Sequence, residues 1–120
     1  MRKTSRAFVS PLASPGGETV FELIGRASEH GGARHSLAHI VIAPGGASSR
    51  HYHKVTEETY YILRGAASMM IDGQPFALGP GDTCLIQPGE VHQIGNPGRD
   101  ELEFLAVCAP AWVPDDSFEA

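Results

Sequence analysis

The chain has 120 residues, which is enough for one hydrophobic core and too few for two. Hydrophobic residues make up 42% of it and charged residues 19%, a balance that is typical of folded domains and excludes a disordered chain. The formal net charge is −5 and no basic run offsets it, which argues against a nucleic-acid-binding protein.

Targeting signals are not evident in the sequence. No stretch approaches the length that a membrane-spanning helix needs. Arg2, Lys3 and Arg6 are basic, but the apolar run of a signal peptide does not follow them. Cys84 and Cys108 both lie in apolar runs, so we expect buried, reduced thiols. We therefore expect a cytoplasmic protein that does not bind a membrane.

Glycine and proline, with 14 and 9 residues, separate short apolar runs along the chain. This distribution favours many short strands joined by turns. Residues 1–17 are expected to be a flexible N-terminal segment, because Pro11, Pro15, Gly16 and Gly17 discourage regular structure. Strands are predicted, in chain order, at 18–24, 36–43, 51–53, 59–64, 67–71, 76–78, 83–87, 91–94 and 102–108.

The connections fit the same picture. Arg26–Arg34 is polar and contains glycine, which predicts a loop, and Asp72-Gly73 is a strong signal for a type I′ hairpin turn. No segment has helical periodicity. So many short strands imply a β-sandwich or barrel over residues 18–110. Residues 111–120 are expected to be a tail in which Trp112 is the one large side chain.

Two histidines one residue apart begin the third predicted strand. Because residues i and i+2 of a strand point to the same face, His51 and His53 project together, roughly 6–7 Å apart at the backbone. Both imidazoles can then reach one ion. Glu57, Glu58 and His92 are further candidate ligands. Alternation does not choose between the two glutamates, because both are in phase with apolar residues.

The residues around these candidates resemble the two conserved motifs of the cupin superfamily. The first motif is matched by Gly45-x5-His51-x-His53-x4-Glu58-x6-Gly65. The second is matched by Gly81-Asp82 and by Pro88-Gly89-Glu90-Val91-His92-Gln93-Ile94-Gly95-Asn96, although Gln87 stands where the family commonly has proline. The resemblance implies a small single-domain cupin, which is an all-β double-stranded β-helix or jelly-roll barrel and is usually a dimer.

The resemblance also implies that one divalent metal is held by His51, His53, Glu58 and His92, with Glu58 preferred over Glu57. Three imidazoles and one carboxylate suit iron, manganese, nickel, zinc, cobalt or copper better than calcium or magnesium. The alternative is a fold that keeps its shape with a vacant or a purely structural site.

Four further residues are candidates to line a substrate cavity beside the ion: Tyr60, Met69, His39 and Phe104. Packing within the strand is the alternative for Tyr60, and a structural role is the alternative for His39.

Four protein ligands leave two adjacent positions of a six-coordinate ion open, so a small substrate can chelate it through paired oxygens. Glu58 is also a candidate catalytic base, since a carboxylate that leaves the ion can accept a proton. We expect a dioxygenase that acts on an oxygen-chelating substrate. The alternatives are a metal-dependent isomerase or lyase with a sugar-like substrate, and a non-catalytic module that binds a small ligand.

The resemblance further suggests that terminal strands pair across a dimer. We therefore expect a homodimer that uses the strand at 18–24, with Trp112 packed over the end of the barrel or against the partner.

Overall fold

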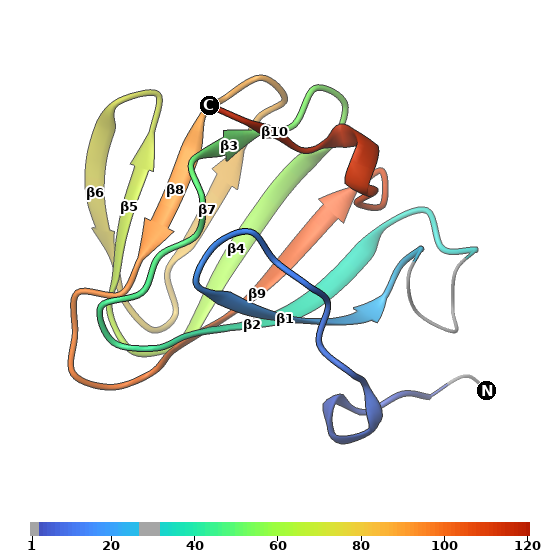
Figure 1. Cartoon of the computed structure of the whole chain (residues 1–120), viewed down its shortest axis with the longest axis horizontal. Helices are drawn as coiled ribbons and strands as arrows, with labels where there is room; N and C mark the ends of the chain where they lie inside the picture. The colour runs from blue at the N-terminus through green and yellow to red at the C-terminus, as the bar shows by residue number, and fades with distance from the viewer. Residues whose placement is uncertain (1–2, 27–31) are drawn as a thin grey trace.

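The computed structural model describes residues 3–26 and 32–120, which form two antiparallel five-stranded sheets (Figure 1). The first sheet contains, in spatial order, β1 (Glu18–Ile24), β2 (Ser36–Ile42), β9 (Leu102–Ala109), β4 (Glu57–Arg64) and β7 (Thr83–Ile86). The second contains β10 (Phe118–Glu119), β3 (His51–Tyr52), β8 (His92–Gly95), β5 (Ala67–Ile71) and β6 (Gln74–Leu78). The chain passes repeatedly between the two sheets, and the result is the predicted jelly-roll barrel.

The turns explain why the strands end where they do. Asp72 and Gly73 join β5 to β6 with φ angles of 46° and 81°, the left-handed conformations that a type I′ turn needs at both central positions. The predicted hairpin is therefore confirmed. Gly65 lies between β4 and β5 with φ of 86°, and a Cβ added there would lie 2.6 Å from the backbone oxygen of Glu101. Only glycine fits at this crossing.

Each of the nine predicted strands corresponds to a strand of the structure, with differences of one or two residues at the ends. The structure begins β6 two residues earlier than predicted, at Gln74, and the strand therefore includes Pro75. Since β6 is at the edge of its sheet, a residue without an N–H is tolerated there. The tenth strand was not predicted: the C-terminal tail forms a short 3-10 helix, η2 (Pro114–Asp116), and then β10, which pairs with β3.

The N-terminal segment, over residues 3–17, contains a single turn of 3-10 helix, η1 (Arg6–Phe8). Farther along, the N–H of Leu12 donates to the carbonyl of Val20 at 2.8 Å, so this segment lies against β1. The predicted loop Arg26–Arg34 lies partly outside the described residues. Within 3–26 and 32–120, no helix has the length and apolar character that crossing a bilayer requires.

The hydrophobic core lies between the two sheets and follows the alternation of the strands. In β4, Glu58, Tyr60 and Ile62 are buried. Cys84 and Cys108 are also buried and are not joined in a disulfide, which confirms the expectation for both thiols. The core is made of these residues: Ile40, Ile42, Tyr60, Ile62, Ala67, Met69, Leu78, Cys84, Ile86, Ile94, Leu102, Phe104 and Ala106.

Candidate metal centre

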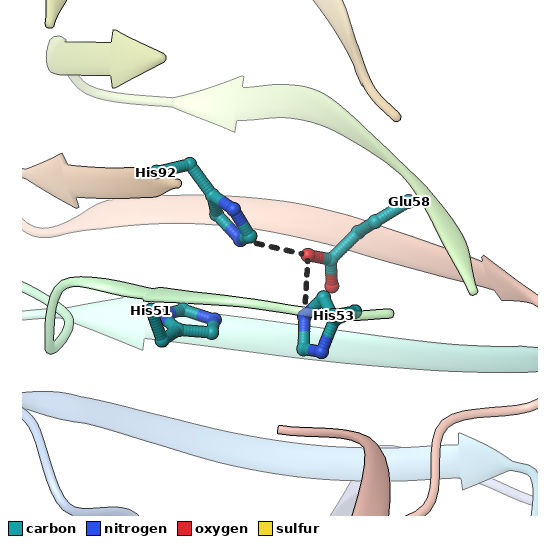
Figure 2. Close-up of side chains that lie close together, drawn as sticks. All are labelled: His51, His53, Glu58 and His92. Atoms are coloured by element: carbon teal, nitrogen blue, oxygen red, sulfur yellow. Dashed lines mark ion pairs between the residues drawn. The ribbon is translucent and has the colours of Figure 1, made fainter. Parts of the chain in front are cut away.

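Three strands bring the four predicted ligands together inside the barrel. His51 and His53 lie on and directly after β3, and β3 pairs with β8 so that His51 is opposite His92. Glu58 reaches the same point from β4 in the other sheet. The ligand atoms of all four residues lie within 4.8 Å of one another, and Figure 2 shows the side chains converging from their separate strands.

The structure also distinguishes the two neighbouring glutamates. Glu58 is only 7% exposed, and its Oε1 lies 3.3 Å from Nε2 of His92 and 3.5 Å from Nε2 of His53 (Figure 2). Glu57 is exposed on the opposite face of β4. The phase of β4 is set by Tyr60 and Ile62, which face the core. Glu58 shares their face, so it is the glutamate that the structure places with the histidines.

Each imidazole is oriented by a backbone carbonyl. Nδ1–H of His51 donates to the carbonyl of Ser49 at 2.8 Å, and Nδ1–H of His92 donates to that of Glu90 at 3.0 Å. Nδ1–H of His53 donates to the carbonyl of Asp116 at 2.8 Å. With Nδ1 engaged as a donor, the Nε2 lone pair of each ring is left to face the shared space. Histidine ligands of metal ions in proteins are commonly fixed in this way.

Two polar atoms at the centre lack a hydrogen-bond partner among the described residues. They are Oε1 of Glu58 and Nε2 of His92, and both are buried. Leaving such groups unsatisfied is costly. A cation bound between them would satisfy both, and the set of three imidazoles and a carboxylate suits a divalent transition metal. The residues present therefore fit the metal that was predicted for them.

The electrostatics keep Glu58 and His51 in the protonation states that bind a metal, and they act differently on His53. Burial opposes ionisation of Glu58, but the nearby Nε2 groups of His53 and His92 outweigh it and hold the pKa of the carboxyl well below its usual range. Burial, together with the neighbouring His92, lowers the pKa of His51 and favours its neutral ring. Burial would also lower the pKa of His53, but the adjacent Glu58 carboxylate outweighs it, so the pKa of His53 is raised.

A buried thiol holds the second oxygen of the carboxylate ligand. Sγ of Cys108 lies 3.3 Å from Oε2 of Glu58 and donates to it. Burial, and then the charge of Glu58, raise the pKa of Cys108, so the thiol keeps its proton. The carboxylate is thereby oriented with Oε1 towards His53 and His92. Sequence analysis predicted burial for Cys108 and missed this contact.

The C-terminal tail supports the centre through Asp116. Its carboxylate accepts hydrogen bonds from the backbone N–H groups of Lys54 at 2.8 Å, Val55 at 3.1 Å and Thr56 at 3.0 Å. Its own carbonyl accepts the bond from His53. The loop between β3 and β4 is therefore tied to the tail. No sequence signal pointed to Asp116, because its partners lie about 60 residues earlier in the chain.

A cavity of about 120 Å³ opens beside the metal ligands His51, His53 and Glu58. Tyr60 and Phe104 line it, as does Trp112 from the tail. The N-terminal segment contributes residues 12–15. Both ends of the chain thus line the cavity together with the barrel.

The predictions that His39 and Met69 line this cavity are wrong. In β2 the neighbours Ala38 and Ile40 face the cavity, so His39 points to the outside of the sheet, where its Nε2 lies 3.0 Å from Oε1 of Glu103. Met69 faces inward but is packed in the filled part of the core. Ile94, its partner across β5 and β8, lines the cavity instead.

Two glutamates of β1 also line the cavity, and sequence analysis did not identify them. Glu18 and Glu22 flank Val20 on the inward face of the strand. In a strand over residues 18–24, Glu18, Val20 and Glu22 lie on one face, and Thr19, Phe21 and Leu23 lie on the other. The second face is the more apolar of the two, so the sequence pattern alone would predict that it faces the core.

Comparison with known proteins agrees with this architecture. Residues 38–108 match the family described as Cupin domain. The chain is 31% identical over 115 residues to an uncharacterized protein of Methanocaldococcus jannaschii, which covers 96% of this chain and 91% of that protein. It is 36% identical over 85 residues to an oxalate-binding protein of Thermotoga maritima, covering 71% of this chain and 69% of that protein. Among solved structures, the polyketide cyclase RemF of Streptomyces resistomycificus superposes with a TM-score of 0.82 and 25% identity, over 100% of this chain and 85% of that one.

Proposed function

This chain belongs to the cupin domain family, and from that premise we propose that it is a metal-dependent enzyme acting on a small molecule that chelates the ion through paired oxygens. One observation carries the proposal. Four buried or half-buried residues offer ligand atoms within 4.8 Å of one another, and three of them, His51, His53 and Glu58, line a cavity to which both ends of the chain contribute. A site of this kind combines metal ligands with room for a ligand of the ion.

The ion that His51, His53, Glu58 and His92 would hold is iron, manganese, nickel, zinc, cobalt or copper. When bound, such an ion supplies Lewis acidity to an oxygen ligand, and iron or manganese also supplies redox chemistry. The contribution of the chain is to orient the ligands through backbone carbonyls and to surround the substrate with a mostly apolar wall.

The reaction that we propose is a dioxygenation. Dioxygen is the second reactant, both of its oxygen atoms end in the product, and the organic substrate supplies the four electrons. Glu58 is the candidate base, because it lines the cavity and its Oε1 carboxylate oxygen has no hydrogen-bond partner among the described residues. Burial raises the pKa of the Tyr60 phenol and so keeps it protonated. Tyr60 is therefore suited to donate a hydrogen bond to an oxygen atom of a bound substrate.

A redox-neutral cyclisation, isomerisation or lyase reaction is the second candidate. The similarity to a polyketide cyclase extends over 100% of this chain, which favours it. Reaction progress measured with and without dioxygen, on a panel of catechols, diketones and hydroxyketones, separates the two candidates. Turnover that continues without dioxygen supports the second. Binding without turnover under both conditions would leave a ligand-binding module.

The metal site has its own test in the pair Glu58→Gln and Glu57→Gln. Loss of the carboxylate ligand is expected to lower the affinity for Co²⁺ or Zn²⁺ by at least about tenfold, since the amide is a weaker ligand. Glu57→Gln changes an exposed neighbour and is expected to leave the affinity as it is. Competition with a chromogenic chelator measures both. Equal affinities for wild type and Glu58→Gln would contradict the assignment.

We also propose a cytoplasmic location, which the two free cysteines support, and a homodimer. Exposed apolar side chains on the outer face of the first sheet support the dimer.

A further inference from the structure

We propose that β1 makes the cavity selective for small chelating ligands that present an O–H or N–H group, and that Glu18 excludes dianionic chelators of the same size. This inference rests on the proposed metal site and specifies the charge of the ligand that the site accepts.

The position of Glu18 follows from the register of β1. Glu18 pairs with Ile42 and Val20 pairs with Ile40, and both partners belong to the core. Side chains of paired residues share a face of the sheet, so Glu18 points into the barrel with them. A carboxylate at such a position is unusual, because the inward face of a barrel strand is normally apolar.

The carboxylate of Glu18 lies near the backbone that precedes the metal ligand His51. A Cβ added to Gly16 would lie 2.6 Å from Oε2 of Glu18 and 2.5 Å from the backbone N of Ser49. The carboxylate therefore lies beside the segment whose Ser49 carbonyl orients the His51 ring. Glycine at position 16 allows this close approach. Tyr60 lines the same cavity as Glu18.

Oε2 of Glu18 is buried and has no hydrogen-bond partner among the described residues. A buried acceptor without a donor is unfavourable, and a ligand that donates an O–H or N–H to it would relieve this. A ligand carboxylate at the same place would instead set two anions side by side in a space of low dielectric constant. The free oxygen therefore discriminates by charge and by hydrogen-bond type.

No lysine or arginine among the described residues lines the cavity to offset this effect. Glu18, Glu22 and Glu58, in contrast, contribute carboxylates to its lining. Glu22 lies farther along the same face of β1, opposite Ala38. A bound divalent ion would offset two of these negative charges, and a dianionic ligand would restore the excess.

The cavity also limits the size and surface of the ligand. Its volume is about 120 Å³. For comparison, a cavity of about 150 Å³ lined by apolar side chains accommodates benzene. Apolar lining residues around the ion include Val20, Ile40, Ile94 and Phe104. The ligand expected is thus compact, with an apolar part, a pair of chelating oxygens and a donor on the side of β1. Oxalate, which appears in the name of the oxalate-binding relative, lacks both the donor and the apolar part.

Oxalate and oxamate provide a matched test. They have the same size and chelating geometry, but oxamate replaces one carboxylate by an amide and carries one negative charge less. Binding to the Co²⁺-loaded protein is measured by calorimetry and by the absorption spectrum of the ion. Each affinity is divided by the affinity of the same anion for aqueous Co²⁺, so that intrinsic chelating strength cancels.

The wild-type protein is expected to favour oxamate over oxalate by about tenfold on this scale, the size of effect that one additional anionic contact produces across a few ångströms of protein. Glu18→Gln keeps the shape of the side chain and removes its charge, and it is expected to move the ratio towards oxalate by a similar factor. Glu57→Gln removes an exposed carboxylate outside the cavity and should leave the ratio unchanged.

A wild-type ratio that favours oxalate, or a ratio that Glu18→Gln does not change, overturns the inference and leaves the metal site intact. A wild-type protein that binds no Co²⁺ overturns both. If Glu18→Gln does not fold, the wild-type ratio decides alone, because it is measured on the unaltered chain.

Discussion

Asp116 shows how one residue can position a ligand to which it is not adjacent in sequence. Its carboxylate holds three consecutive backbone N–H groups from Lys54 to Thr56, and its carbonyl accepts Nδ1–H of His53. The loop before β4 and the ring of His53 therefore depend on the same residue. Because a hydrogen bond to the second nitrogen sets the orientation of a histidine ligand, Asp116 is a positioning residue of the candidate metal centre.

Replacing Asp116 with alanine is expected to weaken metal binding and stability together. Loss of the carboxylate leaves N–H groups unsatisfied, including that of the buried Thr56, which costs about 1–3 kcal/mol of unfolding free energy. Displacement of His53 lowers metal affinity by about 10–100-fold, as is usual for residues that support a ligand. Denaturant unfolding and chelator competition measure the two effects.

The neighbouring Asp115 is exposed and serves as the control, so Asp115→Ala should change neither quantity. In the more conservative Asp116→Asn, one acceptor oxygen remains, and an intermediate affinity is expected. Full metal affinity in Asp116→Ala would show that the tail has no part in positioning His53.

At the scale of the strands, the turn between β4 and β5 is a point where backbone conformation and packing both require glycine. Gly65 and Gly81 have nearly the same φ, 86° and 88°. A Cβ on Gly65 would meet the backbone of Glu101 at 2.6 Å and Leu102 at 3.0 Å, whereas a Cβ on Gly81 would meet nothing within 4 Å. Comparing the two positions separates the cost of a left-handed residue from the cost of a steric clash.

Gly81→Ala is expected to lower the unfolding free energy by about 1–2 kcal/mol, the cost of placing an L residue in this conformation. Gly65→Ala carries the same cost and must also move β9 away from β4, which adds about 1–3 kcal/mol. Denaturant unfolding of both variants gives the difference. Equal losses would mean that the close approach of Gly65 to Glu101 does not constrain the barrel.

The strands were predictable where the sequence carries local signals. Asp72-Gly73 and Gly65 mark the ends of β4, β5 and β6, and the spacing of the histidines and Glu58 matches a family motif. The tail was not predictable in the same way, since β10 exists only because Phe118 and Glu119 lie opposite Tyr52 and His51. The inward direction of Glu18 is likewise set by its pairing with Ile42. Long-range register of this kind leaves no local pattern.

At the scale of the whole molecule, the two faces of the first sheet differ in an unexpected way. Its inner face carries the core and Glu58, yet its outer face also exposes large apolar side chains. Tyr61, Leu63, Leu85 and Val107 are 45%, 43%, 50% and 37% exposed. Leu85 and Val107 both lie opposite Thr59, two residues from Tyr61, so these side chains form one outer patch across β4, β7 and β9. Contiguous apolar surface of this kind is typical of an interface.

A second copy of the chain is the partner that we expect on the outer patch. Because one face packed against the same face of another copy gives closed two-fold symmetry, the assembly would stop at a dimer. This arrangement uses the outer face of β9, β4 and β7, whereas the predicted use of the N-terminal strand would instead involve β1 at the opposite edge of the sheet. Wild-type protein should sediment as a dimer of 12.8 kDa chains, and the double variant Tyr61→Lys with Leu85→Lys should sediment as a monomer. The two lysines would place like charges across the symmetry axis and leave ammonium groups unpaired in an apolar contact.

Phe8→Lys, at a side chain that is 90% exposed and outside the patch, controls for the general effect of added charge. A monomeric wild type at micromolar concentration would refute the dimer, and a dimeric double variant would place its interface elsewhere on the barrel.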